Sequence, residues 1–240
     1  MAPVDRLKVM KLKCIGLFIL LVFGCAVLEA APPRIILVFP LENMSGNESL
    51  GWMSEGIADL LATRLSSPAR YVLQRGERDD AYEQLGLPLE TPLTLASEYK
   101  VARALGATVA VVGQFTLKGG QLVTQVQWLN LAKLRLSRPV AVTGKLDDLD
   151  ALETRLAWDL LRSHDGQAPA KTEEAFANRF PPVLLGAFES YIRGILSTDP
   201  QSRVHFLQES DRLDPLDHRA ASRSPCPVDL NRSETPSTDS

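Results

Sequence analysis

The spacing of apolar residues predicts alternating strands and helices between residues 34 and 163. The apolar run Ile35–Phe39 leads into Pro40 and then into a polar turn, which predicts a buried strand followed by a loop. From Met53 to Leu65 the apolar residues recur at helical spacing. A buried strand, a glycine-containing loop and an amphipathic helix form the first half of a βαβ unit.

The next stretch predicts a short strand and two helices before a long buried strand. Residues 70–74 have the composition of a strand, and a brief helix after them ends at Gly86. Thr94 suits the N-cap of a second helix, and Gly106 suits the position after its last turn. Residues 108–117 are almost continuously apolar, as in a strand that is covered on both faces.

Two more strands and a helix complete this pattern. The pair Gly119-Gly120 predicts a hairpin turn, and residues 122–129 then alternate as a half-buried strand does. Residues 134–143 predict a third strand, and Pro139 places it at a sheet edge because proline cannot donate a ladder hydrogen bond. A final helix opens with aspartates and has one apolar face. That face consists of Leu149, Leu152, Leu156 and Leu160.

The element order β-α-β-α-α-β-β-β-α predicts an α/β fold for residues 34–163. Its mixed β-sheet is parallel where helices cross over and antiparallel in the closing meander, and helices flank it. Residues 164–181 are interpreted as a linker because their first part is polar and contains Gly and Pro.

Residues 182–219 predict a short α-helical hairpin. Pro182 suits a first helical turn, and the second helix closes at Leu213-Asp214-Pro215, so the pair resembles one tetratricopeptide repeat. A single repeat does not bury its own apolar face, and about three are needed. Either the hairpin packs on the α/β domain or a partner, or the chain is a truncated form of a longer repeat protein. Residues 220–240 are predicted to be disordered.

The first residues predict export. Residues 1–31 have a basic flank, a short apolar core and small residues before a proline pair, which is the pattern of a signal peptide. Cleavage after Ala30 is the simplest reading. The segment ending at Cys25 also resembles a bacterial lipobox, which would make Cys25 the site of lipidation. Both alternatives predict an exported protein.

Composition narrows the function classes. The chain has 240 residues, of which 45% are hydrophobic and 23% charged, as in a globular protein. A net charge of −3 and the lack of a Lys/Arg stripe argue against nucleic acid. All three cysteines lie in the leader or the tail, so neither a disulfide framework nor a thiolate metal site is predicted for the domain.

No cofactor and no catalytic group are predicted. Gly46, Gly51 and Gly56 lie between a strand and a helix, but their spacing fits neither the dinucleotide fingerprint nor the Walker motif. The histidines fall in separate elements and are not expected to converge.

Two blocks of sequence resemble the TolB-like N-terminal domain. Residues 38–46 contain Pro, Asn, Ser and Gly in the family's order, and 51–61 continue with the acidic-Gly-Ile segment of its first helix. Leu105-Gly106-Ala107, which leads into a valine-rich strand, resembles the second block. The matching positions, to which the resemblance gives structural roles, are Pro40, Asn43, Ser45, Gly46, Gly56, Gly106 and Gly113. The resemblance implies a non-catalytic envelope module of the kind found ahead of tetratricopeptide arrays.

These observations predict an exported, non-enzymatic envelope scaffold or adaptor that binds proteins. The physical grounds for a partner are the edge strand at 134–143 and the unsatisfied apolar face of the hairpin. Membrane contact is expected only through the leader or a lipid on Cys25. One alternative is a subunit of an outer-membrane or secretion assembly, since curli-secretion and flagellar-envelope proteins have similar α/β domains. Another is a small-ligand-binding or hydrolytic enzyme with a cleft near Asn43–Gly51.

Overall fold

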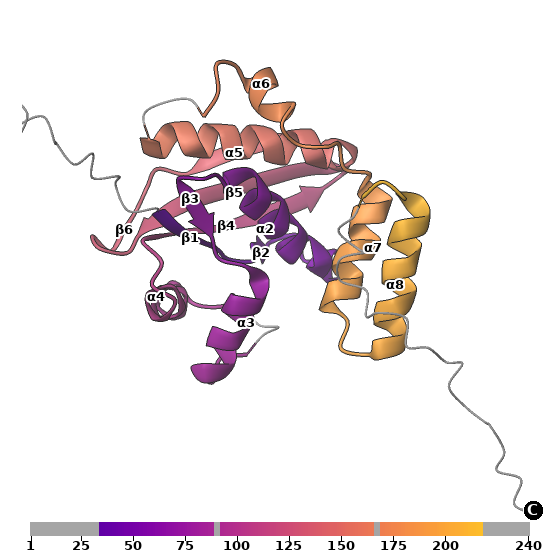
Figure 1. The fold of residues 1–240 in the computed structure, drawn as a ribbon, viewed down its shortest axis with the longest axis horizontal. Coiled ribbons are helices and arrows are strands. Elements are labelled where there is room, and N and C mark those ends of the chain that lie inside the picture. Colours follow the sequence, from indigo (N-terminus) through magenta and orange to yellow (C-terminus); the bar gives the residue numbers. More distant parts are fainter. Residues whose placement is uncertain (1–33, 89–91, 166–168, 218–240) are drawn as a thin grey trace, which may run out of the picture. The chain divides into compact units, whose positions relative to one another are not determined.

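The structure is a computed structural model that describes residues 34–88, 92–165 and 169–217 (Figure 1). All of these belong to one compact unit, which begins at Pro33. The predicted signal peptide with Cys25 and Ala30, and the predicted tail at 220–240, lie outside the described residues.

The strands and helices follow the predicted order. The strands are β1 Arg34–Val38, β2 Glu42–Asn43, β3 Arg70–Val72, β4 Val109–Lys118, β5 Gln121–Asn130, β6 Arg135–Leu136 and β7 Val140–Lys145. The α-helices are α2 Gly51–Leu65, α3 Arg75–Gln84, α4 Leu95–Ala104, α5 Leu149–Asp165, α6 Glu173–Ala177, α7 Leu185–Leu196 and α8 Pro200–Leu213. Two short 3₁₀ helices, η1 Glu48–Leu50 and η2 Leu146–Asp148, precede α2 and α5.

The sheet is mixed, as predicted. Its strands lie in the order β3-β1-β4-β5, with β6 and β7 both paired to β5 and the short β2 paired to β4. β1 runs parallel to β3 and β4, whereas β4, β5 and β7 form an antiparallel meander. The first described strand therefore lies in the interior of the sheet.

Each face of the sheet has its own hydrophobic cluster. In β1, Ile36 and Val38 face a large cluster with α2, α5 and α7, while Leu37 and the following Phe39 face a smaller one with α3 and α4. The alternation of side chains along a strand produces this division. Figure 1 shows α5 and α2 on one side of the strands and α3 and α4 on the other.

A one-residue bulge at Pro40 shifts the register beside β4. Val38 lies opposite Val111, but Glu42 lies opposite Gln114, so three residues of the first strand oppose two of β4. The extra residue turns Leu41 onto the same face as Ile36 and Val38. The sequence pattern alone would place Leu41 on the opposite face.

A second bulge at Ser137–Pro139 splits the predicted strand 134–143 into β6 and β7. Leu136 lies opposite Leu129 and Val140 opposite Val126, which leaves one extra residue on the outer strand. The Ser137 hydroxyl oxygen accepts a hydrogen bond of 3.0 Å from the backbone N–H of Trp128. The predicted edge strand is thus present, with an interruption at its proline.

The C-terminal helices pack against the α/β part. The predicted linker 164–181 contains α6, whose Phe176 is buried and lies 5.6 Å (ring centroids) from Trp158 of α5. The hairpin of α7 and α8 joins the large hydrophobic cluster, because Phe188 of α7 packs on Trp52 of α2. The apolar face that the sequence left without a partner is therefore covered within the chain.

Candidate functional site

The loop between β2 and α2 uses its polar groups to close upon itself. The Asn43 side chain accepts a hydrogen bond from the Ser45 N–H (2.9 Å) and donates one to the Asn47 carbonyl (2.9 Å). The Ser45 hydroxyl oxygen accepts from the N–H of Leu117 on β4 (2.7 Å). Gly46 has φ +68°, a left-handed turn position that glycine favours. This geometry fastens the loop to the sheet and leaves little for a ligand.

The remaining glycines of the family motif lie at a turn and at close approaches. Gly106 has φ +68° after the last turn of α4, as its C′ position requires. A Cβ on Gly113 would lie 2.3 Å from the carbonyl oxygen of Gln125, so only glycine fits there. A Cβ on Gly56 would lie 3.2 Å from the Phe188 ring, so Gly56 lets α7 approach α2.

A buried charged cluster lies where α2 and α3 meet. Arg78 of α3 donates to a carboxylate oxygen of Glu55 at 2.7 Å, and both side chains are buried. Arg75 lies 3.9 Å from Glu55 and 3.0 Å from Asp79, and it donates to the Ile195 carbonyl of α7 at 2.6 Å. Burial lowers the pKa of Arg78, but the Glu55 carboxylate and other neighbouring groups outweigh it, so the pKa is raised. These charges hold α2, α3 and α7 together.

A second buried polar group lies between β5, α2 and α5. Glu153 is fully buried, and one of its carboxylate oxygens accepts a hydrogen bond from the Thr124 hydroxyl at 3.2 Å. Arg64 donates to the Thr154 hydroxyl at 2.8 Å and is ion-paired with Asp150. Burial raises the pKa of Glu153 to about 8, and the attraction of Arg64 offsets only part of that effect.

A third carboxyl group, Glu98 of α4, is partly buried and lies near Glu42 of β2. Burial, and secondly the charge of Glu42, raise the pKa of Glu98 to about 7. The sequence did not single out Glu55, Glu98 or Glu153 as a buried acid. Glu153 carried a signal, since it lies on the helical stripe of Leu149, Leu156 and Leu160.

Two surface hollows in the described ranges lie away from the loop 43–51. One is shallow and lies on the outer side of α8, beside Val204 and His205. The other is small and lies at the start of β1, beside Trp128 and His164. Within the same ranges no group of three acidic, histidine or cysteine residues could hold a metal ion, and no helix is apolar and long enough to cross a bilayer.

The outer edge of the meander is the remaining candidate. β7 pairs with β5 on one side and, among the described strands, has no neighbour on the other. The backbone N–H of Trp128 donates to the Ser137 hydroxyl oxygen, and the Trp128 carbonyl accepts from the Ser137 N–H. These two bonds fix which residues of β5 direct their backbone groups toward the outer strand. Because hydrogen-bonded and non-hydrogen-bonded pairs alternate along an antiparallel pair of strands, the backbone groups of Ala141, Thr143 and Lys145 on β7 point away from the sheet. They form an open row of donors and acceptors.

The strands and turns of the meander carry several basic side chains. Between residues 118 and 145 the sequence has five cations and no carboxylate. They are Lys118, Lys133, Arg135, Arg138 and Lys145. On the same strands the side chains of Val123 and Thr143 are exposed, because α3 and α4 pack on other parts of that face.

The strand order and the flanking helices define a mixed α/β domain with a helical hairpin. No protein-family model matches the chain, and no curated protein matches it. The TolB-like family membership therefore stays a prediction. Several solved structures are similar over about half of the chain.

One is the LpoB C-terminal domain from Salmonella enterica, with 16% identity, 48% of this chain and 84% of that chain covered, and a TM-score of 0.39. Another is the lipoprotein GNA1162 from Neisseria meningitidis, with 17% identity and a TM-score of 0.41. The match covers 47% of this chain and 81% of that chain. TolB from Acinetobacter baumannii matches with 12% identity and a TM-score of 0.40. The match covers 57% of this chain and 29% of that chain. At this level of likeness the matches assign no function to this chain.

Proposed function

We propose that the chain is an exported, non-enzymatic adaptor of the cell envelope that binds a protein partner along β7. The observation that carries this proposal is the open row of backbone groups at Ala141, Thr143 and Lys145. An extended segment of a partner can add to such an edge as one more strand, with main-chain hydrogen bonds supplying the affinity. The export signal supports the location in the envelope.

The buried charges support a non-enzymatic role. A catalytic group needs to reach a substrate, but Glu55 and Arg78 are paired with each other inside the protein. Glu153 is also fully enclosed. The polar side chains of Asn43 and Ser45 are used within their own loop and against β4.

The proposal predicts that Thr143→Pro abolishes partner binding. Proline removes the outward N–H of residue 143 and blocks strand addition, while the inward bonds of Val142 and Gly144 remain. The matched control is Thr143→Val, which keeps the N–H and suits a strand. Both variants are compared with the wild type by cross-linking and recovery from envelope extracts.

Loss of the cross-linked partner in Thr143→Pro alone supports the edge contact. Equal recovery with both variants contradicts it. Mass measurement by light scattering separates an adaptor from the alternative of a subunit in a large ring, because a ring subunit should assemble without a partner.

A further inference from the structure

Basic residues gather at the end of the sheet where the parallel strands begin. β1 and β3 start there with Arg34 and Arg70, which lie opposite each other. The turn from β5 to β6 adds Lys133 and Arg135, and α5 ends there with Arg162. The segments of this basic end, 34–36, 66–71, 105–109, 130–136 and 160–164, contain no Asp or Glu, and one acidic residue, Asp165, follows them as the last residue of α5.

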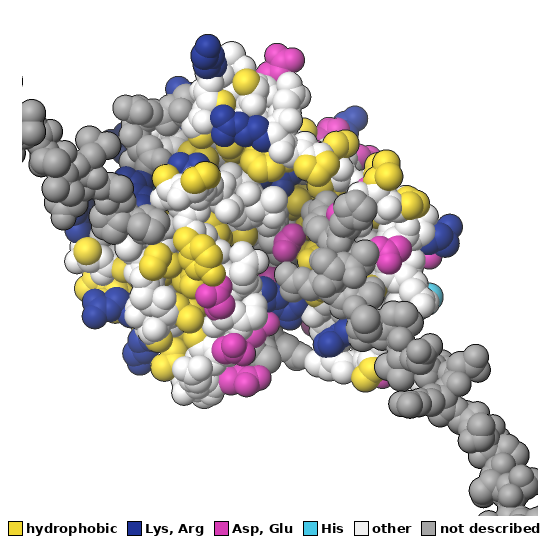
Figure 2. All heavy atoms as spheres, in the orientation of Figure 1, with side chains coloured by type: hydrophobic (Ala, Val, Ile, Leu, Met, Phe, Trp, Pro, Cys, Tyr) yellow, Lys and Arg dark blue, Asp and Glu magenta, His cyan; other side chains and the backbone are white. Residues whose placement is uncertain are grey.

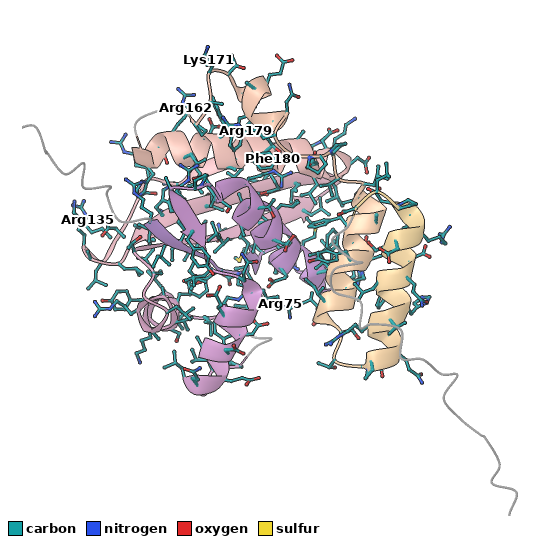
Figure 3. The ribbon with its side chains drawn as sticks, viewed as in Figure 1. Arg75, Arg135, Arg162, Lys171, Arg179 and Phe180 are labelled. Atoms are coloured by element: carbon teal, nitrogen blue, oxygen red, sulfur yellow. The ribbon has the colours of Figure 1, made fainter. Side chains whose placement is uncertain are left out.

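These cations differ in their contacts with the rest of the fold. Arg34 hydrogen-bonds to His164 and Arg70 to the Leu65 carbonyl. Among the described residues Lys133, Arg135 and Arg162 form no ion pair. Figure 3 shows Arg135 and Arg162 at the same end of the molecule, one on the β6 turn and one near the end of α5.

An exposed leucine lies between two of the cations. Leu134 has 63% of its surface exposed and a φ of +50°, a left-handed conformation that is unfavourable for leucine. Glycine or asparagine would form this turn with less strain. Leu136, two residues on, is 40% exposed. The fold alone therefore gives no reason for an apolar side chain at this tip.

We propose that the basic end docks on the surface of an anionic phospholipid membrane. Cations there would lie at the lipid phosphates, and Leu134 would enter the boundary between headgroups and acyl chains. This docking is separate from the strand contact proposed above and uses another part of the molecule.

Helix-dipole stabilisation and protection of the sheet edge explain some of the basic residues but do not explain the exposed Leu134. Arg162 favours the negative end of the α5 dipole, and Arg138 with Pro139 protects the edge from unwanted pairing. Neither effect requires an apolar side chain at Leu134. An acidic protein segment would pair with the cations but would not call for an exposed leucine between them.

The direction of the chain and the distribution of charge both favour an orientation in which the basic end faces the membrane. Arg34 follows Cys25 by nine residues, a length that spans at most about 30 Å when extended. Acidic residues lie at the opposite end of the sheet, where η1 and η2 contain Glu48, Asp147 and Asp148. In Figure 2 the left rim, where β6 and the end of α5 lie, shows dark blue and yellow side chains, while magenta gathers over α3.

The test uses the chain from Ala31 onward, which contains both hydrophobic clusters and has no leader that would bind lipid by itself. Binding to vesicles of phosphatidylcholine with about 30% phosphatidylglycerol is measured by co-sedimentation. The wild type should bind these vesicles and should not bind pure phosphatidylcholine. The double variant K133E/R135E should bind at least about twenty-fivefold less, because each basic residue lost near an anionic surface removes a factor of about five and the new carboxylates add repulsion.

The matched control is K118E/K145E, which makes the same change of charge at the opposite end of the meander. It should keep wild-type binding, and Leu134→Ser should lose part of it. Circular dichroism and thermal unfolding verify that each variant is folded.

Equal losses in both double variants, or no binding to anionic vesicles, would overturn the proposal. Binding to polyglutamate without binding to vesicles would assign the surface to an acidic protein instead. Thr143→Pro should leave vesicle binding unchanged, so the two proposals fail separately.

Discussion

Two buried glutamates in this protein have opposite electrostatic surroundings. Glu55 lies 2.7 Å from Arg78 and has Arg75 as a second cation nearby. Glu153 receives a hydrogen bond from Thr124, while the nearby cation Arg64 is ion-paired with Asp150. Within the part of the chain that the structure describes, one of the Glu153 carboxylate oxygens has no hydrogen-bond partner.

The difference shows two ways of keeping a carboxyl group inside a protein. Glu55 has a cation in hydrogen-bond contact, and the attraction between the two side chains offsets the loss of hydration on burial. Glu153 instead retains its proton, since burial raises its pKa to about 8. Three predictions test this contrast.

The largest effect is expected from breaking the Glu55 pair. Arg78→Met leaves a buried carboxylate without its cation and should lower the free energy of unfolding by about 3–5 kcal/mol. The double variant E55L/R78M removes both charges and should recover most of the loss. Urea unfolding of the three proteins measures both values. Equal stability of the single and double variants would contradict an ion-paired Glu55.

A pH-dependent effect, which reaches a similar size only near pH 8, is expected from Glu153→Gln. Below the ordinary glutamate pKa of 4.5 both folded and unfolded chains hold the proton, so the substitution should change little. From 4.5 to about 8 only the folded chain holds it, and wild-type stability should fall by about 1.4 kcal/mol per pH unit from this group. The glutamine variant should lack this slope. Unfolding curves at several pH values measure it, and parallel profiles for the two proteins would show that Glu153 is charged.

The smallest effect is expected from Thr124→Val. It removes the hydrogen bond to Glu153 and should lower stability by about 1 kcal/mol. Thr63→Val is the control, because Thr63 is exposed and hydrogen-bonds within its own helix. Its unfolding midpoint should differ little from that of the wild type. A greater loss for Thr63→Val than for Thr124→Val would contradict the assignment.

Much of the fold was predictable because apolar spacing reports which face of an element is buried. The position of Pro139 correctly predicted an edge strand, and Gly106 correctly predicted the end of α4. The two bulges were not predictable, since the extra residue at Pro40 reverses the face of Leu41 only after β4 has paired. α6 was missed because five residues are too few to establish a helical period.

The site was harder to predict than the fold. The edge strand of the meander was predicted from Pro139 alone. The direction of its backbone groups could not be predicted, because it depends on the pairing of Trp128 with Ser137. The hairpin's apolar face suggested a partner, yet it packs on α2, where Gly56 makes room for Phe188. Packing between distant segments is not recorded in local sequence patterns. Exposed Leu134 became informative only through its left-handed backbone.

The interior position of β1 has a mechanical consequence. A force applied at Arg34 acts along β1, which is hydrogen-bonded to β3 on one side and to β4 on the other. Such a pull loads both ladders in shear, so their hydrogen bonds resist together. A pull on the far end of α8 instead peels the hairpin away one turn at a time. The chain is thus expected to yield first at its helical hairpin and last at β1.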